Sequence, residues 1–193
     1  MSTELCHRVE RIVEKACAAE TNVFGYGIWT HHITDVVANG RCLAPLFEAD
    51  AEIVEVAALL HDYASVKDVA LYPEHHVHGP IEAEKLLRRL EYPSPKIEAV
   101  CHAIATHRAS VPVERRSREA ECLANADAMA HIQNVTSLLH LVYVRRHEGI
   151  DEGAAWVRAK LERSWHKLSP RVRDRVDDDY RAALRVLRQR EAP

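Results

Sequence analysis

The chain has 193 residues, of which 47% are hydrophobic and 28% are charged, as in an ordinary globular protein. Its 26 basic and 29 acidic residues give a formal charge of −3, which argues against a nucleic-acid polymer as partner, because such partners call for a strongly basic surface. The longest uninterrupted apolar run, residues 56–60, is far below the ~18 residues of a membrane-spanning helix, so no membrane partner is expected.

At this length the chain suits one domain spanning residues 1–193. Its five cysteines are odd in number and form no C-x-x-C pair, which predicts reduced thiols and no disulfide framework. The N-terminal residues contain no apolar core of the kind found in a signal peptide, so we expect a cytoplasmic protein. Thirteen histidines are many for this length, and because histidine is a common metal ligand they point to a metal site.

The chain is predicted to be all-α, because Ala, Leu, Glu and Arg dominate it and the alternation of β-branched residues is scarce. Two glycines break the chain within residues 21–29, and residues 64–78 are expected to form an irregular, histidine-rich connection. In chain order, helices are expected at about residues 3–20, from 30, 50–62, 79–90, 95–108, from 117, 135–147, and twice between 150 and 190.

The two late helices, within residues 150–190, each have one apolar stripe at i, i+4 spacing, which is the pattern of a single buried face. They carry no side chains that suggest chemistry. We therefore interpret them as packing elements beside a motif-bearing core at about residues 28–135.

The pair His61-Asp62 lies at the predicted end of the helix that Asp50 caps. At a helix end, an imidazole ring and an adjacent carboxylate can both turn toward one cation, and such a mixed shell suits a borderline divalent metal. A lone His-Asp pair is better explained as a helix C-cap, so the metal-site interpretation depends on its neighbours.

Other segments offer further metal-competent side chains. His32 lies on an apolar helical face, four residues before Val36. Asp127 is a carboxylate among small and apolar residues, where it would be costly to bury without a cation or strong hydrogen-bond donors. His78 and His107 lie at predicted helix ends beside irregular chain. Five segments therefore each offer a ligand.

The order His…His-Asp…His…His…Asp resembles the HD-domain superfamily of metal-dependent phosphohydrolases. Residues 29–36, Trp-Thr-His-His-Ile-Thr-Asp-Val, look like its first motif, His-x-x-x-Val at a helix start. Residues 57–62, Ala-Ala-Leu-Leu-His-Asp, look like the central motif, and residues 124–127, Ala-Asn-Ala-Asp, look like the last. The resemblance covers about residues 28–135 and implies a single-domain helical bundle of the HD-domain type.

The resemblance also implies a ligand set. Its four core ligands carry over to His32, His61, Asp62 and Asp127. Members with a second metal have two more histidines between the central and last motifs, and residues 78–86 together with His107 resemble these. We therefore expect one or two divalent ions, with two favoured; Fe, Mn, Co, Ni, Zn and Mg are not distinguished. The expected metal ligands are His32, His61, Asp62, His78, His107 and Asp127.

Several histidines compete for these roles. His31 is an alternative to His32, and either His75 or His76 could replace His78 as a ligand. We prefer His78, and interpret His75 and His76 as substrate-binding groups. No function is expected for His7, His102, His131, His140, His147 and His166.

A phosphorylated substrate needs positive charge beyond the metal. Arg108 directly follows a proposed ligand and is the best candidate for a catalytic and substrate-binding guanidinium, since the arginine fork fits phosphate oxygens. Arg115, Arg116 and Arg118 are better explained as a solvated basic loop. Lys67 is a weaker substrate-binding candidate.

The resemblance implies an enzyme, a phosphohydrolase that acts on a nucleotide or another small phosphorylated metabolite through a metal-activated water. His61, Asp62 and Arg108 are the expected catalytic residues, with Asp62 between the metals. The alternative is a di-iron oxygenase of the same fold that oxidises or cleaves a C–H bond of a phosphonate or polyol. A non-catalytic binding module is a third hypothesis. The oligomeric state stays open.

Overall fold

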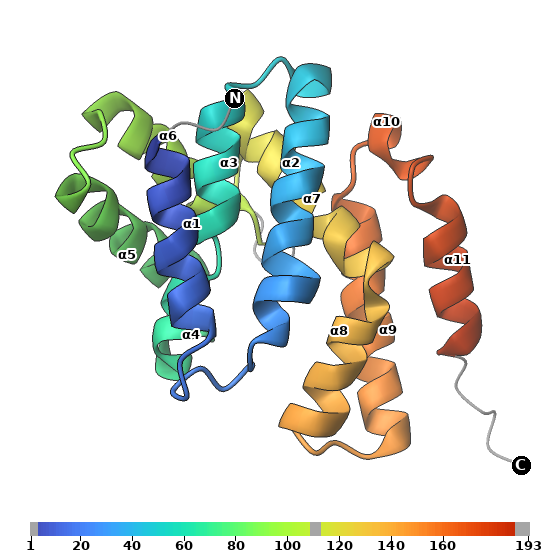
Figure 1. Ribbon diagram of the computed structural model, residues 1–193. Coiled ribbons are helices and arrows are strands. Elements are labelled where there is room, and N and C mark those ends of the chain that lie inside the picture. Colours follow the sequence, from blue (N-terminus) through green and yellow to red (C-terminus); the bar gives the residue numbers. More distant parts are fainter. Residues whose placement is uncertain (1–3, 109–112, 188–193) are drawn as a thin grey trace, which may run out of the picture.

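The computed structural model describes residues 4–108 and 113–187, and within these ranges every regular element is a helix (Figure 1). The expected all-α, single-domain class is confirmed. The elements are α1 (Glu4–Cys17), the π-helical turn η1 (Trp29–Ile33), α2 (Thr34–Phe47), α3 (Ala51–Leu60), α4 (Tyr63–Lys67), the 3-10 turn η2 (Val69–Leu71), α5 (His75–Arg89), α6 (Ser94–Thr106), α7 (Arg118–Gln133), α8 (Val135–His140), the π-helical turn η3 (Leu141–Arg145), α9 (Ile150–Lys167), α10 (Pro170–Arg173) and α11 (Asp177–Val186).

Helix α7 forms the centre of the molecule and is buried at Ala120 and over residues 122–132. It packs against α2, α3, α6 and α9. Five alanines, at positions 120, 124, 126, 128 and 130, let these neighbours approach closely, since an alanine adds little width to a helix. At its start, the Ser117 side chain accepts a hydrogen bond from the Ala120 amide at 3.1 Å, which satisfies one of the unpaired N–H groups of the first turn.

Helix α3 lies in the core and presents the His61-Asp62 pair at its end. Asp50 caps the helix as expected, since its carboxylate accepts hydrogen bonds from the amides of Glu52 and Ile53 at 2.9 and 3.3 Å. The helix ends at Leu60, and the backbone of Asp62 leaves the helical conformation with φ −109° and ψ 5°. The change in backbone direction lets the two adjacent side chains face the same region.

Helix α5 begins at His75, four residues earlier than the sequence indicates. We interpreted Gly79-Pro80 as the start of this helix, and that prediction is wrong. Gly79 lies inside α5 and is required by packing: a Cβ atom there would lie 2.9 Å from Ile104 Cγ2 and 3.4 Å from the His61 carbonyl oxygen. The glycine lets α5 approach α6 and the end of α3.

The C-terminal helices pack on the side of α7 away from α5 and α6 (Figure 1). Helix α9 contacts α7, α8 and η3, and α11 contacts both α7 and α9. Leu161 and Val157 of α9 are fully buried, so the expected apolar stripe does pack into the core.

Within the described ranges, no helix is long and apolar enough to cross a membrane.

Candidate metal centre

Three buried side chains from distant segments form the first group of possible ligands. His32 comes from η1, His61 from the end of α3 and Asp127 from α7. The Nε2 atoms of His32 and His61 lie 3.1 Å apart, and His32 Nε2 lies 3.6 Å from Asp127 Oδ1. The extra backbone bulge of a π-helical turn often occurs at functional sites, and here it carries His32.

A second group lies beside the first and consists of Asp62, His75 and His107. His75 Nε2 is 4.0 Å from Asp62 Oδ1, and the centres of the His75 and His107 rings are 5.3 Å apart. In each group the possible ligand atoms all lie within 4.8 Å of one another. Both groups are therefore compact enough to surround a cation.

Asp62 connects the two groups. Its Oδ2 atom lies 3.4 Å from His32 Nε2 and 3.3 Å from His61 Nε2, whereas its Oδ1 atom faces His75. One carboxylate thus presents an oxygen to each group.

Three of the four histidines are oriented in the same way. A backbone carbonyl can only accept, so each Nδ1 that contacts one carries the proton and each Nε2 keeps its lone pair. This arrangement fixes ring orientation and is common among metal-binding histidines. The pairs are His61 with the Ala58 carbonyl at 2.7 Å, His75 with Tyr72 at 2.9 Å and His107 with Ile104 at 2.6 Å.

The electrostatics of the groups also suit a divalent cation. Burial, reinforced by His61, lowers the pKa of His107 to about 3, so this ring is neutral at physiological pH and its lone pair is free. Burial alone would lower the pKa of His61, but the Asp62 carboxylate outweighs it and raises the pKa. The negative potential that favours a proton on His61 also favours a metal cation. Four imidazoles and two carboxylates fit a borderline divalent metal such as Fe, Mn, Co, Ni or Zn.

The Asp127 carboxylate is contacted by two residues that the sequence did not indicate as functional. Lys167 donates to Asp127 Oδ2, and His131 Nε2 lies 3.1 Å from Asp127 Oδ1. Burial alone would raise the pKa of Asp127, but the Lys167 ammonium and then His131 hold it well below its usual range. His131 was expected to have no function; its i+4 spacing from Asp127 was the signal that could have singled it out. Lys167 lies 40 residues from Asp127, where no periodicity applies.

The structure brings together five of the six expected metal ligands: His32, His61, Asp62, His107 and Asp127. His78 is absent from both groups. Because α5 already begins at His75, His78 lies within the helix rather than at its start, and His75 lies beside Asp62, with its Nε2 atom 4.0 Å from Asp62 Oδ1. The geometry therefore favours the alternative ligand His75 over His78.

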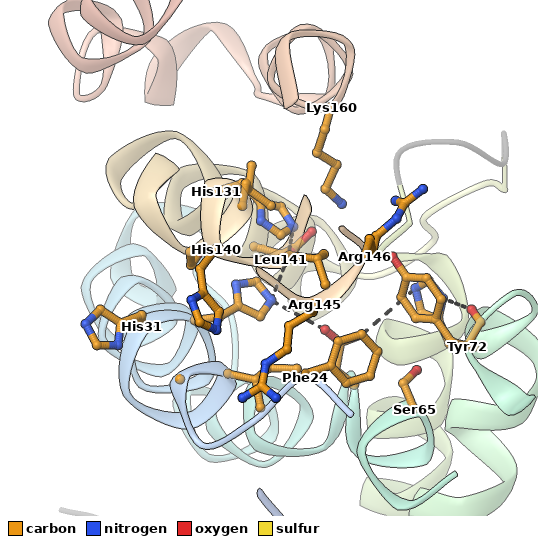
Figure 2. A pocket seen from close by; sticks show the side chains of 18 of the residues that line it. Phe24, His31, Ser65, Tyr72, His131, His140, Leu141, Arg145, Arg146 and Lys160 are labelled. Carbon is orange, nitrogen blue, oxygen red and sulfur yellow. Dashed lines mark hydrogen bonds and ion pairs between the residues drawn. The ribbon is translucent and has the colours of Figure 1, made fainter. Parts of the chain in front are cut away.

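A cavity of about 700 Å³ opens beside the two groups (Figure 2). It is bounded on one side by η1 and the segment before it and on the other by α8, η3 and α9. Its positively charged lining residues are Arg108, Arg145, Arg146, Lys160 and Arg163, and its apolar ones include Phe24, Ile28, Leu138, Leu141 and Trp156. Figure 2 shows Lys160 reaching toward the cavity from α9. Helix α9, which we expected only to pack, thus lines the cavity as well.

The expected substrate-binding residues have different positions. Arg108 lines the cavity, where it donates to the Pro73 carbonyl at 2.7 Å and contacts His76 Nδ1 at 3.1 Å. His76 is not among the lining residues, so it contacts Arg108 rather than the cavity. Lys67 is also not among them: it pairs with Glu82 at 2.6 Å on the surface.

The basic segment after Arg108 lies partly outside the described residues, which omit 109–112. Its three other arginines form ion pairs with carboxylates. They are Arg115 with Glu121 at 3.5 Å, Arg116 with Glu114 at 3.6 Å and Arg118 with Glu48 at 2.7 Å. Arg116 and Arg118 are exposed, as expected, whereas Arg115 is half-buried and also donates to the Thr106 carbonyl at 3.2 Å.

The fold and the site define an all-α protein with two clusters of histidine and aspartate side chains that could hold a metal ion. The HD-domain family model matches residues 29–132, and the chain belongs to this family. No curated protein matches the sequence.

Two solved structures share the fold. Bacillus subtilis YpgQ, solved in complex with ADP, superposes with a TM-score of 0.69 at 20% sequence identity, over 95% of this chain and 94% of YpgQ. A predicted HD superfamily hydrolase from an uncultured Thermotogales bacterium gives a TM-score of 0.60 at 19% identity, over 94% of this chain and 88% of the other. Family membership and the two groups of possible ligands support a metal-dependent hydrolase in general.

Proposed function

We propose that the protein is a metal-dependent phosphohydrolase that acts on a nucleotide or another small phosphorylated metabolite. The observation that carries this proposal is the position of the two ligand groups, joined by Asp62, beside a cavity lined by five positively charged side chains. A metal ion held by these ligands would activate a water as the nucleophile, and cations bind phosphoryl oxygens, so the two together suit a phosphate ester.

The proposed ligands form two sets that share Asp62. His32, His61, Asp62 and Asp127 would hold one ion, and Asp62, His75 and His107 a second. A divalent cation in such a site lowers the pKa of water from 15.7 to roughly 7 and so supplies hydroxide at neutral pH. Asp62 and the Nε2 atoms fix where that chemistry takes place, and the protonated Nδ1 atoms keep the rings from turning.

Most of the cations that line the cavity are available for a substrate; of the five, Arg146 already pairs with Glu148. Lys160, Arg145 and Arg163 form no ion pair within residues 4–108 and 113–187. Charges that line a cavity without a partner gain most from an anionic ligand, because the ligand replaces water with charge-assisted hydrogen bonds. Arg108, which lines the cavity next to the proposed ligand His107, would neutralise charge on a phosphoryl group.

The apolar lining supports an organic group attached to the phosphate. Phe24, Ile28 and Leu141 can cover a flat, weakly polar moiety such as a base, and a cavity of about 700 Å³ is large enough for a nucleotide-sized ligand. The structural neighbour YpgQ was solved with ADP, which is consistent with a nucleotide in this chain as well.

The proposal predicts phosphate release without oxygen. Protein reconstituted with Mn²⁺ or Co²⁺ is expected to hydrolyse at least one member of a panel of nucleoside mono-, di- and triphosphates and sugar phosphates under strict anaerobiosis, measured as released phosphate or pyrophosphate. The same six ligands could also hold two irons for C–H oxidation. Turnover that requires dioxygen and mixed-valent iron would therefore contradict the hydrolase proposal and support the oxygenase alternative.

A second prediction concerns the cations. Lys160→Met is expected to raise KM about 10- to 100-fold for the best substrate of that panel, because one charge-assisted hydrogen bond contributes roughly 1.5–3 kcal/mol. Metal content, measured by elemental analysis, is expected to stay unchanged. Lys67→Met is the matched control, since Lys67 pairs with Glu82 outside the cavity. Equal KM changes in both variants would contradict a substrate-binding role for Lys160.

A further inference from the structure

Lys167, the last residue of α9, has a buried ammonium group next to the metal centre. Its side chain is 3% exposed, and Lys167 is not among the residues that line the cavity. Its Nζ atom donates to Asp127 Oδ2 and also to the His107 backbone carbonyl, at 3.0 Å. One side chain therefore links a ligand of the first group to the backbone of a ligand of the second.

The two oxygens of Asp127 have different surroundings as a result. Oδ2 is engaged by the Lys167 ammonium. Oδ1 faces the other way, 3.6 Å from His32 Nε2 and 3.1 Å from His131 Nε2. Of the two oxygens, Oδ1 is the one that faces the first group.

We propose that Lys167 is a positioning residue of the metal centre: it engages Oδ2 of Asp127 so that this carboxylate offers a cation only Oδ1. A carboxylate free to rotate can bind a metal through both oxygens and fill a coordination position. A catalytic metal needs such a position open for water or substrate. This inference rests on the proposed metal site and is independent of the substrate's identity. It makes α9 part of the centre, together with the HD-domain core.

A purely structural ion pair is the competing explanation. Breaking a buried ion pair lowers folding stability whether or not a metal is nearby, so loss of stability cannot separate the two. The absorption spectrum of a bound metal ion can separate the two explanations, because it depends directly on which ligands bind the metal. An effect of charge alone would also be distinguishable. Removing an ammonium group near a cation strengthens cation binding, but it does not change which oxygens bind the cation.

The test uses Co²⁺ as the probe in the full-length protein. Lys167→Met is expected to change the visible absorption spectrum of the Co²⁺-loaded protein, because Asp127 is then free to bind through both oxygens. It is also expected to lower kcat for the chromogenic diester bis(p-nitrophenyl) phosphate about 10- to 100-fold, the usual effect of removing a partner of a metal ligand. KM is expected to change little, because Lys167 lies outside the cavity.

Two controls accompany this variant. Leu161→Ala removes a fully buried side chain from the same helix, and Leu161 neither lines the cavity nor belongs to a ligand group, so the variant is expected to lower the melting temperature but leave the Co²⁺ spectrum and kcat unchanged. Lys167→Arg keeps a charged donor and is expected to restore most of the wild-type spectrum. If Lys167→Met does not fold, Lys167→Gln takes its place under the same criterion.

The outcomes separate this inference from the proposed function. A wild-type spectrum and kcat in Lys167→Met, with only the melting temperature lowered, would show that the ion pair is structural and overturn the inference. A wild-type protein that takes up no Co²⁺ at all would overturn the proposed metal site itself. A changed spectrum in Lys167→Met but not in Leu161→Ala supports the positioning role.

Discussion

Asp62→Asn is expected to abolish metal-dependent turnover and to release bound metal. Asparagine has nearly the same shape, so the fold is retained, but it removes the negative charge that faces both ligand groups. In the variant, one of the two carboxylate oxygens of Asp62 becomes an amide NH₂ group, which cannot bind a cation. With the metal lost, the pKa of water returns from roughly 7 toward 15.7, so we expect kcat/KM to fall by about 10³-fold or more. Elemental analysis and phosphate-release rates measure the two effects.

Glu82→Gln is the matched control for this variant. Glu82 is a half-buried carboxylate that pairs with the exposed Lys67 and Lys85, outside the cavity. Its substitution removes the same charge from the protein and is expected to leave both metal content and activity unchanged. Full metal content and full activity in Asp62→Asn would disprove the shared-ligand arrangement.

His75→Ala is expected to lower the metal content from two ions per chain to one, whereas His78→Ala leaves it at two. His75 Nε2 lies 4.0 Å from Asp62 and its ring lies beside that of His107, but His78 belongs to neither ligand group. The first group does not include His75, so the remaining ion is expected to stay bound in His75→Ala. Metal per chain, measured by elemental analysis after reconstitution with excess Mn²⁺, gives the answer directly.

The pair of variants tests the start of α5 as well as the number of metals. Loss of one ion in His78→Ala, with none lost in His75→Ala, would return the ligand role to His78 and contradict the register in which α5 begins at His75. One ion per chain in the wild type and in both variants would indicate a centre built from the first group alone.

Local patterns in the sequence were sufficient for much of the fold. Capping by Asp50 and the end of α3 at the His61-Asp62 pair depend on interactions within a few residues, which propensities and caps describe well. The helical class follows from composition for the same reason. The resemblance to the three HD-domain motifs then implied that His32, Asp62 and Asp127 lie in one region, and the structure brings them together.

The choice among His75, His76 and His78 depended on tertiary packing. A Gly-Pro pair normally marks a boundary, so the sequence placed the helix start at Gly79. In the structure this glycine is needed where α5 meets Ile104 and the His61 carbonyl, and the helix continues upstream of it. From the sequence alone, a glycine that is needed for close packing cannot be distinguished from a glycine that is needed for a turn.

By itself, then, the sequence determined that this chain is helical and belongs with metal-dependent HD-domain proteins, because those features arise from near neighbours and from motif order. The tertiary structure alone decided that α9 reaches the site, with Lys160 lining the cavity and Lys167 bonded to Asp127. The apolar stripe of α9 predicts that one face is buried, but not against which helix. Contacts between segments 40 residues apart depend on how whole helices pack, and helical periodicity carries no information about that.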